Sequence, residues 1–569
     1  MKRLGCAILI AVAAAAIASL WLGRGPRIED GSALVMELQG RYLESPGVPL
    51  IQRLLGERGQ PFVSLLSELR KAERDERIAS VVLRVRELEI GWAKAQELRD
   101  AIAALGAAGK RTLAYLEVES FSANLEYYVA SAAAGIHSAP AATAPLVGLA
   151  AEYLFLGGLW EKLGVELEVA RVGEYKTAAD FLAGREMSAA HREMADSLLD
   201  SIDAQFVAGI AEGRGLPPEL VRRVIDEAPV RAEELLELGM IDAISSFAEV
   251  RQALDDPPIV EADDYARVPA SDAGIEPAAR VALVYGSGAV VVGRDSASPG
   301  GEPQLASDAV AEALVDAAED DSIDAVLFRI DSPGGSALAS DTVWQATRKV
   351  KESGKPFVVS MSDLAASGGY YVACGADFVY ADPATLTGSI GVFVLRPVLR
   401  ELYAKLDVGA EGLTRGAHAE LLLASRPLSE DGRKRLQQEV VSIYDVFVGR
   451  VAEGRRLSAA QVDALGRGRV WTGAQAAERG LVDALGGLRA AVGRVKQELT
   501  LDPDADVELV PFPSPPGLAE QVEDLLRGAA LRAALPEPAA ALARGLEPWR
   551  AAAASGAPAL VPPLLLEIR

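Results

Sequence analysis

The stretch IASVVLRVRELEIG, which begins at Ile78, has a counterpart in IDAVLFRIDSPGGS, which begins at Ile323. Each copy is an apolar, β-branched run of strand length followed by a segment of helical character. Further along, GKRTLAYLEVESFSANLEYYVASAAAG from Gly109 pairs in the same way with GKPFVVSMSDLAASGGYYVACGAD from Gly354. A self-similarity that covers nearly all of both halves predicts a tandem duplication.

Strands that alternate with amphipathic helical stretches favour βαβ units and a mostly parallel sheet. We therefore predict two α/β domains, at 30–265 and 275–500. The boundary falls in the Pro- and Asp-rich stretch 255–277, which is expected to be a spacer because its periodicity lapses. Helical arms are expected to extend from the two domains, over 188–239 and 429–480.

Both ends of the chain differ from the repeats. Lys2 and Arg3 precede an uncharged run from Leu4 to Gly23 that is long enough to span a bilayer. We predict a membrane anchor over 1–25 that places the rest of the chain on the extracytoplasmic side of the inner membrane. A cleaved signal peptide is the alternative, since the run is rich in alanine. The Pro- and Ala-rich segment 501–569 is expected only to be a packing tail.

The composition excludes several functional classes. The formal net charge of −24 comes without long basic runs, so binding to nucleic acid is not supported. Two cysteines cannot build a disulfide framework, and they leave the redox compartment open. The sequence holds no metal-ligand cluster and no nucleotide-binding loop, so we expect no cofactor and no metal.

Three motifs in the second half have the character of an acyl-transfer site. The turn Asp331–Ser336 follows a strand, and its adjacent glycines let backbone N–H groups approach a ligand. Ser367 follows another strand and opens a helix-like stretch, where free N–H groups favour an oxyanion. The third motif is the loop Leu386–Gly391. An ordinary tight turn and an N-cap serine are the structural alternatives for the first two.

The ordered set SPGGS, ASGGYY and TGSIGV resembles the signal peptide peptidase A family in its long, duplicated form. The resemblance spans roughly 31–500 and implies a fold of the Clp-protease and crotonase-like group. It implies that Ser367 is the nucleophile and that Ser389 orients the base. It also implies that Gly368, with Gly334 or Gly335, donates to the oxyanion.

A serine hydroxyl needs a base to take its proton. None of the three histidines, His137, His191 and His418, falls in a motif, so a Ser-His-Asp triad is poorly supported. Lys176 lies in a segment that resembles the family's lysine motif. A lysine can act as base when burial lowers its pKa from about 10.4 toward 7–8.

The register of the repeat divides the predicted site between the halves. Ser367 aligns with Asn124, and Lys176 aligns with Ala419. The second half therefore keeps the serine and lacks the lysine, while the first half keeps the lysine and lacks the serine. The first half has also lost the SPGGS turn, which is replaced by 87–91, and Leu146 stands in place of Ser389. A working site must therefore be assembled across the interface between the halves. Glu174 is expected to face water, because a carboxylate beside the lysine would keep the amine charged.

The sequence thus predicts a membrane-anchored serine endopeptidase that degrades cleaved signal peptides and other apolar peptides. Its relatives imply a homo-tetramer. Two alternatives stay open: another enzyme of the Clp and crotonase-like fold, and a membrane scaffold whose site has decayed. The retained Ser367, Lys176 and Ser389 favour the peptidase.

Overall fold

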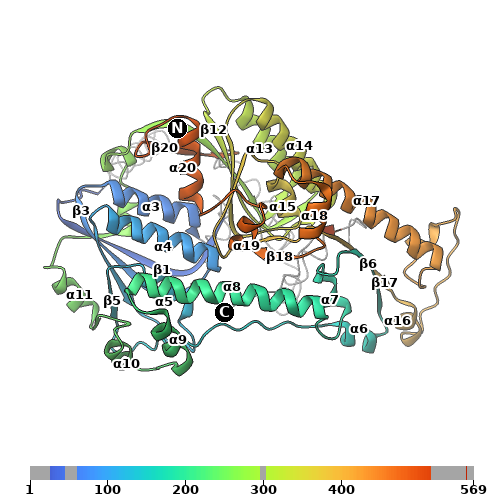
Figure 1. The fold of residues 1–569 in the computed structure, drawn as a ribbon, viewed down its shortest axis with the longest axis horizontal. Coiled ribbons are helices and arrows are strands. Elements are labelled where there is room, and N and C mark those ends of the chain that lie inside the picture. Colours follow the sequence, from blue (N-terminus) through green and yellow to red (C-terminus); the bar gives the residue numbers. More distant parts are fainter. Residues whose placement is uncertain (1–25, 45–59, 295–302, 514–558, 561–569) are drawn as a thin grey trace, which may run out of the picture.

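The structure, a computed structural model, describes residues 26–44, 60–294, 303–513 and 559–560. It contains two α/β lobes side by side, the first at the left of Figure 1 in blue and teal and the second at the right in yellow and orange. The order of elements within each lobe repeats, so the predicted duplication is confirmed.

The first sheet has the strand order β2-β1-β3-β4-β5-β7, and β8 also pairs with β1. All of its pairs are parallel. Its strands are β1 (Ser32–Leu43), β2 (Gln60–Pro61), β3 (Ile78–Glu89), β4 (Arg111–Leu116), β5 (Gly135–Ser138), β7 (Ala243–Ile244) and β8 (Ile259–Glu261). The start of the predicted spacer 255–277 therefore contributes a strand, β8, to this sheet.

The second sheet repeats this order. The parallel strands β9, β12, β14, β15 and β19 correspond to β1, β3, β4, β5 and β7, and β20 pairs with β9 as β8 pairs with β1. Its strands are β9 (Pro277–Ser287), β12 (Ala325–Ser332), β14 (Phe357–Ala366), β15 (Phe378–Ala381), β16 (Leu386–Gly388), β18 (Val470–Thr472), β19 (Ala484–Leu485) and β20 (Asp506–Phe512). The start of the predicted tail thus adds β20 to the second sheet.

The apolar runs that begin near Ile78 and Ile323 form the central strands β3 and β12. Helices cover both faces of each sheet, so side chains on both faces of these strands are buried. β3 and β12 are buried along most of their length, as parallel strands without a solvent face must be. The flanking helices of the first lobe are α3 (Phe62–Arg74), α4 (Trp92–Ala107), α5 (Asn124–Ala130) and α11 (Phe247–Ala253), and those of the second are α13 (Ser307–Glu319), α14 (Ala337–Glu352), α15 (Gly368–Ala373) and α20 (Leu488–Glu498).

The helical arms begin as the sequence predicts. α8 (Ala189–Arg214) is capped by Ser188, and α17 (Glu430–Arg455) is capped by Ser429. α8 runs from the first lobe beneath the second (Figure 1), where its apolar side chains pack on β18. Shorter helices complete the arms and their connections: α6 (Gly157–Leu163), α7 (Ala178–Ala183), α9 (Pro218–Glu227), α10 (Ala232–Glu237), α12 (Ala262–Tyr265), α16 (Arg400–Lys405), α18 (Ala459–Leu465) and α19 (Gly473–Glu478).

A third sheet joins the two lobes. Its order is β11-β10-β13-β21-β17-β6, with β6 (Glu166–Val172) from the first half and β17 (Val392–Val398) from the second. The other strands are β10 (Ala289–Val291), β11 (Gln304–Ala306), β13 (Gly335–Ser336) and β21 (Ala559–Leu560). The antiparallel pair β6–β17 is the element that carries the first half to the predicted site.

The predicted anchor over 1–25 lies outside the described residues. Within the described ranges, no helix has both the length and the apolar character needed to cross a bilayer.

Candidate active site

Ser367 stands between the end of β14 and the start of α15, and its side chain is fully buried. Its backbone has φ 57° and ψ −115°, a region that L-residues adopt at a cost of about 1–3 kcal/mol. Two backbone hydrogen bonds hold it there. Its N–H donates to Gly388 O at 2.8 Å, and its carbonyl oxygen accepts from Tyr371 N–H at 2.8 Å. The strained turn presents the hydroxyl at the carboxyl end of the sheet.

The pairing of β16 with β14 places Ser389 next to Ser367. β16 pairs with β14 in a register that sets Gly388 opposite Ala366, so the residues that follow the two strands are neighbours. Ser389 also has a positive φ, of 53°, and its N–H donates to Arg469 O at 2.7 Å. The sequence placed Ser389 in a loop motif, and the strand register places it beside the serine hydroxyl.

Lys176 belongs to the first half, and a strand pair of the third sheet brings it to the site. β6 runs antiparallel to β17, and Val172 pairs with Val392. The residues that follow Val172 therefore lie beside those that precede Val392. This pairing brings Lys176 next to Ser389 although the two are far apart in the chain.

Glycines make room for the lysine. A Cβ on Gly468 would lie 2.5 Å from Lys176 Cα, and one on Gly391 would lie 3.2 Å from Lys176 Cδ. Any larger residue at position 468 would collide with the lysine backbone. Gly173 fits as closely, because its own Cβ would lie 2.1 Å from the carbonyl carbon of Arg467. The lysine segment is therefore seated on the 467–468 turn of the other half.

The three side chains form one buried cluster. Lys176 Nζ lies 2.7 Å from Ser367 Oγ, 2.9 Å from Ser389 O and 3.0 Å from Ser389 Oγ. Lys176 is 0% exposed, and its burial lowers its pKa well below the ordinary value, because a charged amine would be taken out of water. The structure brings together all three side chains predicted to act in the reaction.

The hydrogen-bond pattern suits a neutral amine. An ammonium that has lost one of its three protons keeps two N–H donors and gains one lone pair. Ser389 supplies two acceptors, its carbonyl oxygen and its Oγ. The lone pair is then left for the O–H of Ser367, which is the hydrogen bond that a base makes with a nucleophile. Glu174, the nearest carboxylate in sequence, is exposed as expected and pairs with Arg467 at 3.0 Å.

The predicted oxyanion glycines adjoin the serine. A Cβ on Gly368 would lie 3.1 Å from both Gly334 Cα and Gly335 N, so the turn after β12 packs against the residue after Ser367. Gly334 has φ 93°, and its N–H donates to Ser332 Oγ at 3.2 Å. Of the two glycines, Gly334 thus already has a partner for its N–H.

The histidines contact other groups. In the described structure, the hydrogen bonds of the Ser367 hydroxyl involve Lys176 and no histidine. The partners of the histidines are Ser245 Oγ, 3.0 Å from His137; the rings of Tyr153 and Phe155 around His191; and Asp431, 3.5 Å from His418.

The first half has replaced its own site with structural contacts. Asn124, the counterpart of Ser367, donates to Gly148 O at 2.7 Å and accepts from Val147 N–H at 3.0 Å. This side chain ties together the same two segments that Ser367 and Ser389 join in the second half. Ala419, the counterpart of Lys176, lies in the short 3₁₀ turn Ala419–Leu422.

Sequence reasoning missed an ionic cluster that supports the site. Lys94 on α4 is buried, and its Nζ lies 2.6 Å from Asp331 and 2.7 Å from Asp363. Asp331 precedes the glycine turn, and Asp363 lies in β14, the strand that ends just before Ser367. The carboxylate of Asp363 also accepts from the N–H groups of Gly91 and Lys94, at the start of α4. Gly91 belongs to residues 87–91, which replace the glycine turn in the first half. This segment thus binds the carboxylate of Asp363 from the second half.

A signal for this cluster was present in the repeat. The register that aligns Ile78 with Ile323 sets Lys94 opposite Ala339, a buried alanine of α14. A lysine where the other copy needs a small buried residue indicates a buried charge with a partner.

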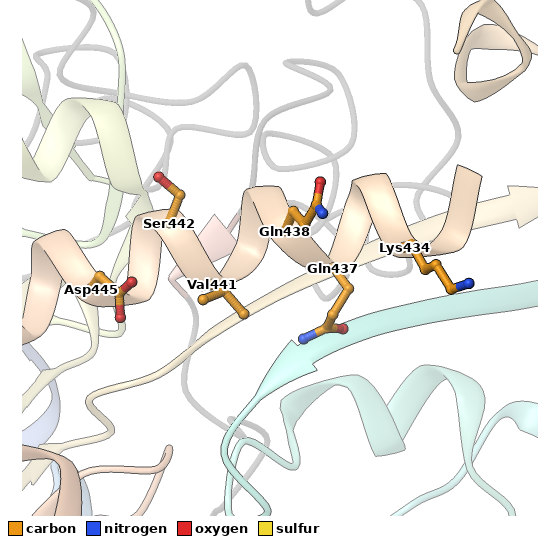
Figure 2. A pocket seen from close by; sticks show the side chains of 6 residues that line it. All are labelled: Lys434, Gln437, Gln438, Val441, Ser442 and Asp445. Carbon is orange, nitrogen blue, oxygen red and sulfur yellow. The ribbon is translucent and has the colours of Figure 1, made fainter. Parts of the chain in front are cut away.

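One pocket lies along α17, and all the residues that line it belong to that helix. Figure 2 shows its lining, in which Gln437 points toward β6 and donates to Arg171 O at 3.0 Å. The lining residues are Lys434, Gln437, Gln438, Val441, Ser442 and Asp445. None is a predicted site residue.

Comparisons with known proteins agree with the duplication. The model of Peptidase family S49 matches residues 104–259 and 349–502. The chain is 33% identical to the chloroplastic serine protease SPPA of Arabidopsis thaliana, over 88% of this chain and 74% of that protein. It is 30% identical to Protease 4 of Haemophilus influenzae, over 84% and 80% of the two chains. A putative signal peptide peptidase SppA of Enterococcus faecium is 36% identical over 32% of this chain and 53% of that one.

Proposed function

The chain belongs to peptidase family S49 and is a serine peptidase of the duplicated type, and from that premise we propose that Ser367 is its nucleophile and Lys176 its general base. The observation that carries this proposal is the 2.7 Å contact between Lys176 Nζ and Ser367 Oγ at a fully buried position. A base must lie within hydrogen-bond reach of the proton that it removes and must be neutral at working pH.

In the proposed reaction, Ser367 and Lys176 act together in two successive stages, acylation and deacylation. Ser367 Oγ attacks the carbonyl carbon of a peptide bond while its proton passes to Lys176 Nζ. The lysine then gives that proton to the leaving amine, and an acyl-enzyme forms on Ser367. Lys176 next takes a proton from a water molecule that attacks the ester and gives it to Ser367 Oγ as the second product leaves, which restores the serine hydroxyl and the neutral amine. Ser389 orients the amine in every step.

The oxyanion is expected to bind at Gly368 and Gly335. These two glycines adjoin each other and Ser367, and backbone N–H groups aimed at the developing charge are the usual donors in acyl transfer. We favour Gly335 over Gly334, since the N–H of Gly334 donates to Ser332.

We further propose that the substrates are apolar peptides, with cleaved signal peptides as the main class. A lysine stays neutral in a water-poor site, and such a site takes apolar side chains more readily than charged ones. The printed name of the Enterococcus faecium relative, a putative signal peptide peptidase, supports the same class.

The proposal includes the predicted location. An anchor over 1–25 would hold the enzyme in the inner membrane with its site on the extracytoplasmic side. A homo-tetramer, as relatives imply, would enclose the sites. Neither binding to nucleic acid nor a cofactor is part of the proposal.

A serine-reactive fluorophosphonate tests the nucleophile, and a pair of peptides tests the substrate class. Wild-type protein should be labelled at Ser367, while Ser367→Ala should not be labelled. The wild type should cleave a Leu- and Ala-rich peptide with a higher kcat/KM than a peptide of equal length rich in Asp and Lys. Labelling that persists in Ser367→Ala would contradict the assignment, and a preference for the charged peptide would contradict the substrate class.

A further inference from the structure

Arg469 lies between two aromatic rings where the two halves meet. The central carbon of its guanidinium lies 4.7 Å from the ring centroid of Tyr175 and 4.5 Å from that of Trp471. Tyr175 directly precedes Lys176 in the first half, and Trp471 lies in β18 of the second. A planar guanidinium is attracted to the negative faces of such rings and stacks on them. One side chain thus ties the lysine segment to the second half.

The same guanidinium binds the helix that runs beneath the second lobe. Its Nη1 donates to Glu193 Oε1 of α8 at 2.6 Å. The hydroxyl of Tyr175 donates to the same carboxylate and lies 3.2 Å from Oε1 and 3.1 Å from Oε2. Arg469, Tyr175 and Glu193 therefore contact one another in a closed triangle. These three residues and Trp471 are called the arginine clamp.

The backbone of Arg469 holds the residue that orients the base. Its carbonyl oxygen accepts from the N–H of Ser389 at 2.7 Å. Two residues earlier, the carbonyl oxygen of Arg467 accepts from the N–H of Tyr175 at 3.0 Å. Arg469 therefore contacts the residue before the base through its side chain, and the residue that orients the base through its backbone.

We propose that Arg469 is a positioning residue, which keeps Lys176 seated beside Ser389 and shielded from water. This inference rests on the proposed function, because it takes Lys176 to be the base. Burial is the cause that lowers the pKa of Lys176. Water admitted to the amine would favour its charged form and so remove the base.

The charges near the lysine segment are already paired with one another. Three carboxylates of this segment and of α8 each bind an arginine, in the pairs Asp180–Arg171, Glu174–Arg467 and Glu193–Arg469. The exclusion of water, and not a free charge in these pairs, is therefore what the clamp contributes to the amine.

The half that has no nucleophile also lacks the clamp. α19 begins at Gly473 as α10 begins at Ala232, and this register sets Arg469 opposite Ala228 and Trp471 opposite Val230. An alanine and a valine cannot form a stack between a cation and a ring. The counterpart of the clamp has thus been lost together with the counterpart of Ser367.

Arg469→Lys tests the positioning role, because lysine keeps the positive charge and loses the planar group that stacks between the rings. The measurement is kcat/KM for an apolar peptide against pH. We expect the midpoint of this profile to move to alkaline pH by about one pH unit, a fraction of the change that full burial can cause. On the acid side of the midpoint, kcat/KM should then fall about tenfold. The alkaline plateau should change less, because at high pH the amine is neutral in both proteins.

Arg479→Lys is the matched control. Arg479 also stacks on Trp471, at 4.1 Å from a ring centroid, but its guanidinium donates to Gln475 O in the preceding helix. The control should leave both the midpoint and the plateau unchanged. An equal shift of the midpoint in Arg479→Lys would assign the effect to the packing of Trp471 and would overturn the proposal.

Tyr175→Leu is the second variant, and it decides the question if Arg469→Lys does not fold. It removes one ring of the stack and leaves every charge in place, so it should move the midpoint in the same direction. Tyr175→Phe, which keeps the ring, should move it less. The rate at which a fluorophosphonate labels Ser367 gives a second pH profile that does not depend on the choice of peptide, and its midpoint should move with the first.

Two results separate this inference from the proposed function. A midpoint that stays in place in Arg469→Lys and Tyr175→Leu, whether rates fall equally at every pH or only Tm falls, would show a merely structural role and overturn the proposal while peptide hydrolysis stands. If the wild type neither hydrolyses peptide nor is labelled at Ser367, the proposed function itself fails and this inference fails with it.

Discussion

Replacing Lys94 by methionine tests how the first half supports the site in the second. The amine of Lys94 lies 2.6 Å from Asp331, 2.7 Å from Asp363 and 3.9 Å from Glu44. Burial opposes its charge, but these carboxylates outweigh burial and raise the pKa of Lys94 above its ordinary value. Methionine has a similar length and no charge, so the substitution leaves Asp331 and Asp363 without their cation, while Glu44 keeps its ion pair with Arg329 at 2.7 Å.

The structure sets the size of the effect. Removing one partner of a buried ion pair costs about 3–5 kcal/mol, because the other charge stays buried without compensation. Here the side chains of Asp331 and Asp363 are each 22% exposed, and Asp363 keeps two backbone N–H donors from α4. Water and these donors offset part of the loss. We expect the free energy of unfolding to fall by about 3 kcal/mol, at the lower end of that range.

Urea unfolding followed by tryptophan fluorescence measures the change, since Trp92 and Trp344 report on the two halves. Lys349→Met, which removes an exposed lysine paired with Glu352, is the matched control and should cost less than about 1 kcal/mol. Adding Asp363→Asn to Lys94→Met should cost less than the sum of the single changes, because the two residues interact directly. Equal midpoints for Lys94→Met and the control would refute the view that this cluster clamps the halves together.

The remaining predictions concern the three central side chains. Ser367→Ala and Lys176→Ala should each abolish peptide hydrolysis, and the double variant should be no worse than either, since residues that act as a unit are not additive; losses that multiply would count against a dyad. Ser389→Ala should lower kcat without abolishing it, by about 1–2 kcal/mol or about five- to thirtyfold, because Lys176 keeps the carbonyl oxygen as a partner; wild-type rates at all pH values would remove its orienting role. A plot of kcat/KM against pH should rise through the lowered pKa of Lys176 and level off on its alkaline side, and an optimum below about pH 6 would exclude a lysine base. Lys176→Met should raise Tm over wild type more at pH 7 than at pH 10. The unfolded wild type binds more protons than the folded form between the lowered pKa and about 10.4, so wild-type stability increases with pH across that window. An equal gain in Tm at the two pH values would contradict the buried neutral amine.

The sequence alone was sufficient to predict the repeat, the fold class and the three side chains, Ser367, Lys176 and Ser389, that the structure brings together. Parallel strands buried on both faces need long apolar runs, and these runs recur at Ile78 and Ile323. The register that they define also predicted that Ser367 and Lys176 belong to different halves and must meet at an interface. The resemblance to a known family then assigned roles to residues that composition and spacing left ambiguous.

Contacts between distant segments were decided only by the tertiary structure. Lys176 reaches Ser389 because β6 pairs with β17, and the register of two antiparallel strands from different halves has no signature in either strand alone. The strain at Ser367, the room made by Gly468 and the choice between Gly334 and Gly335 depend on atoms that the fold brings within a few ångströms of one another. A linear pattern records which faces of an element are buried, and it does not record what they are buried against.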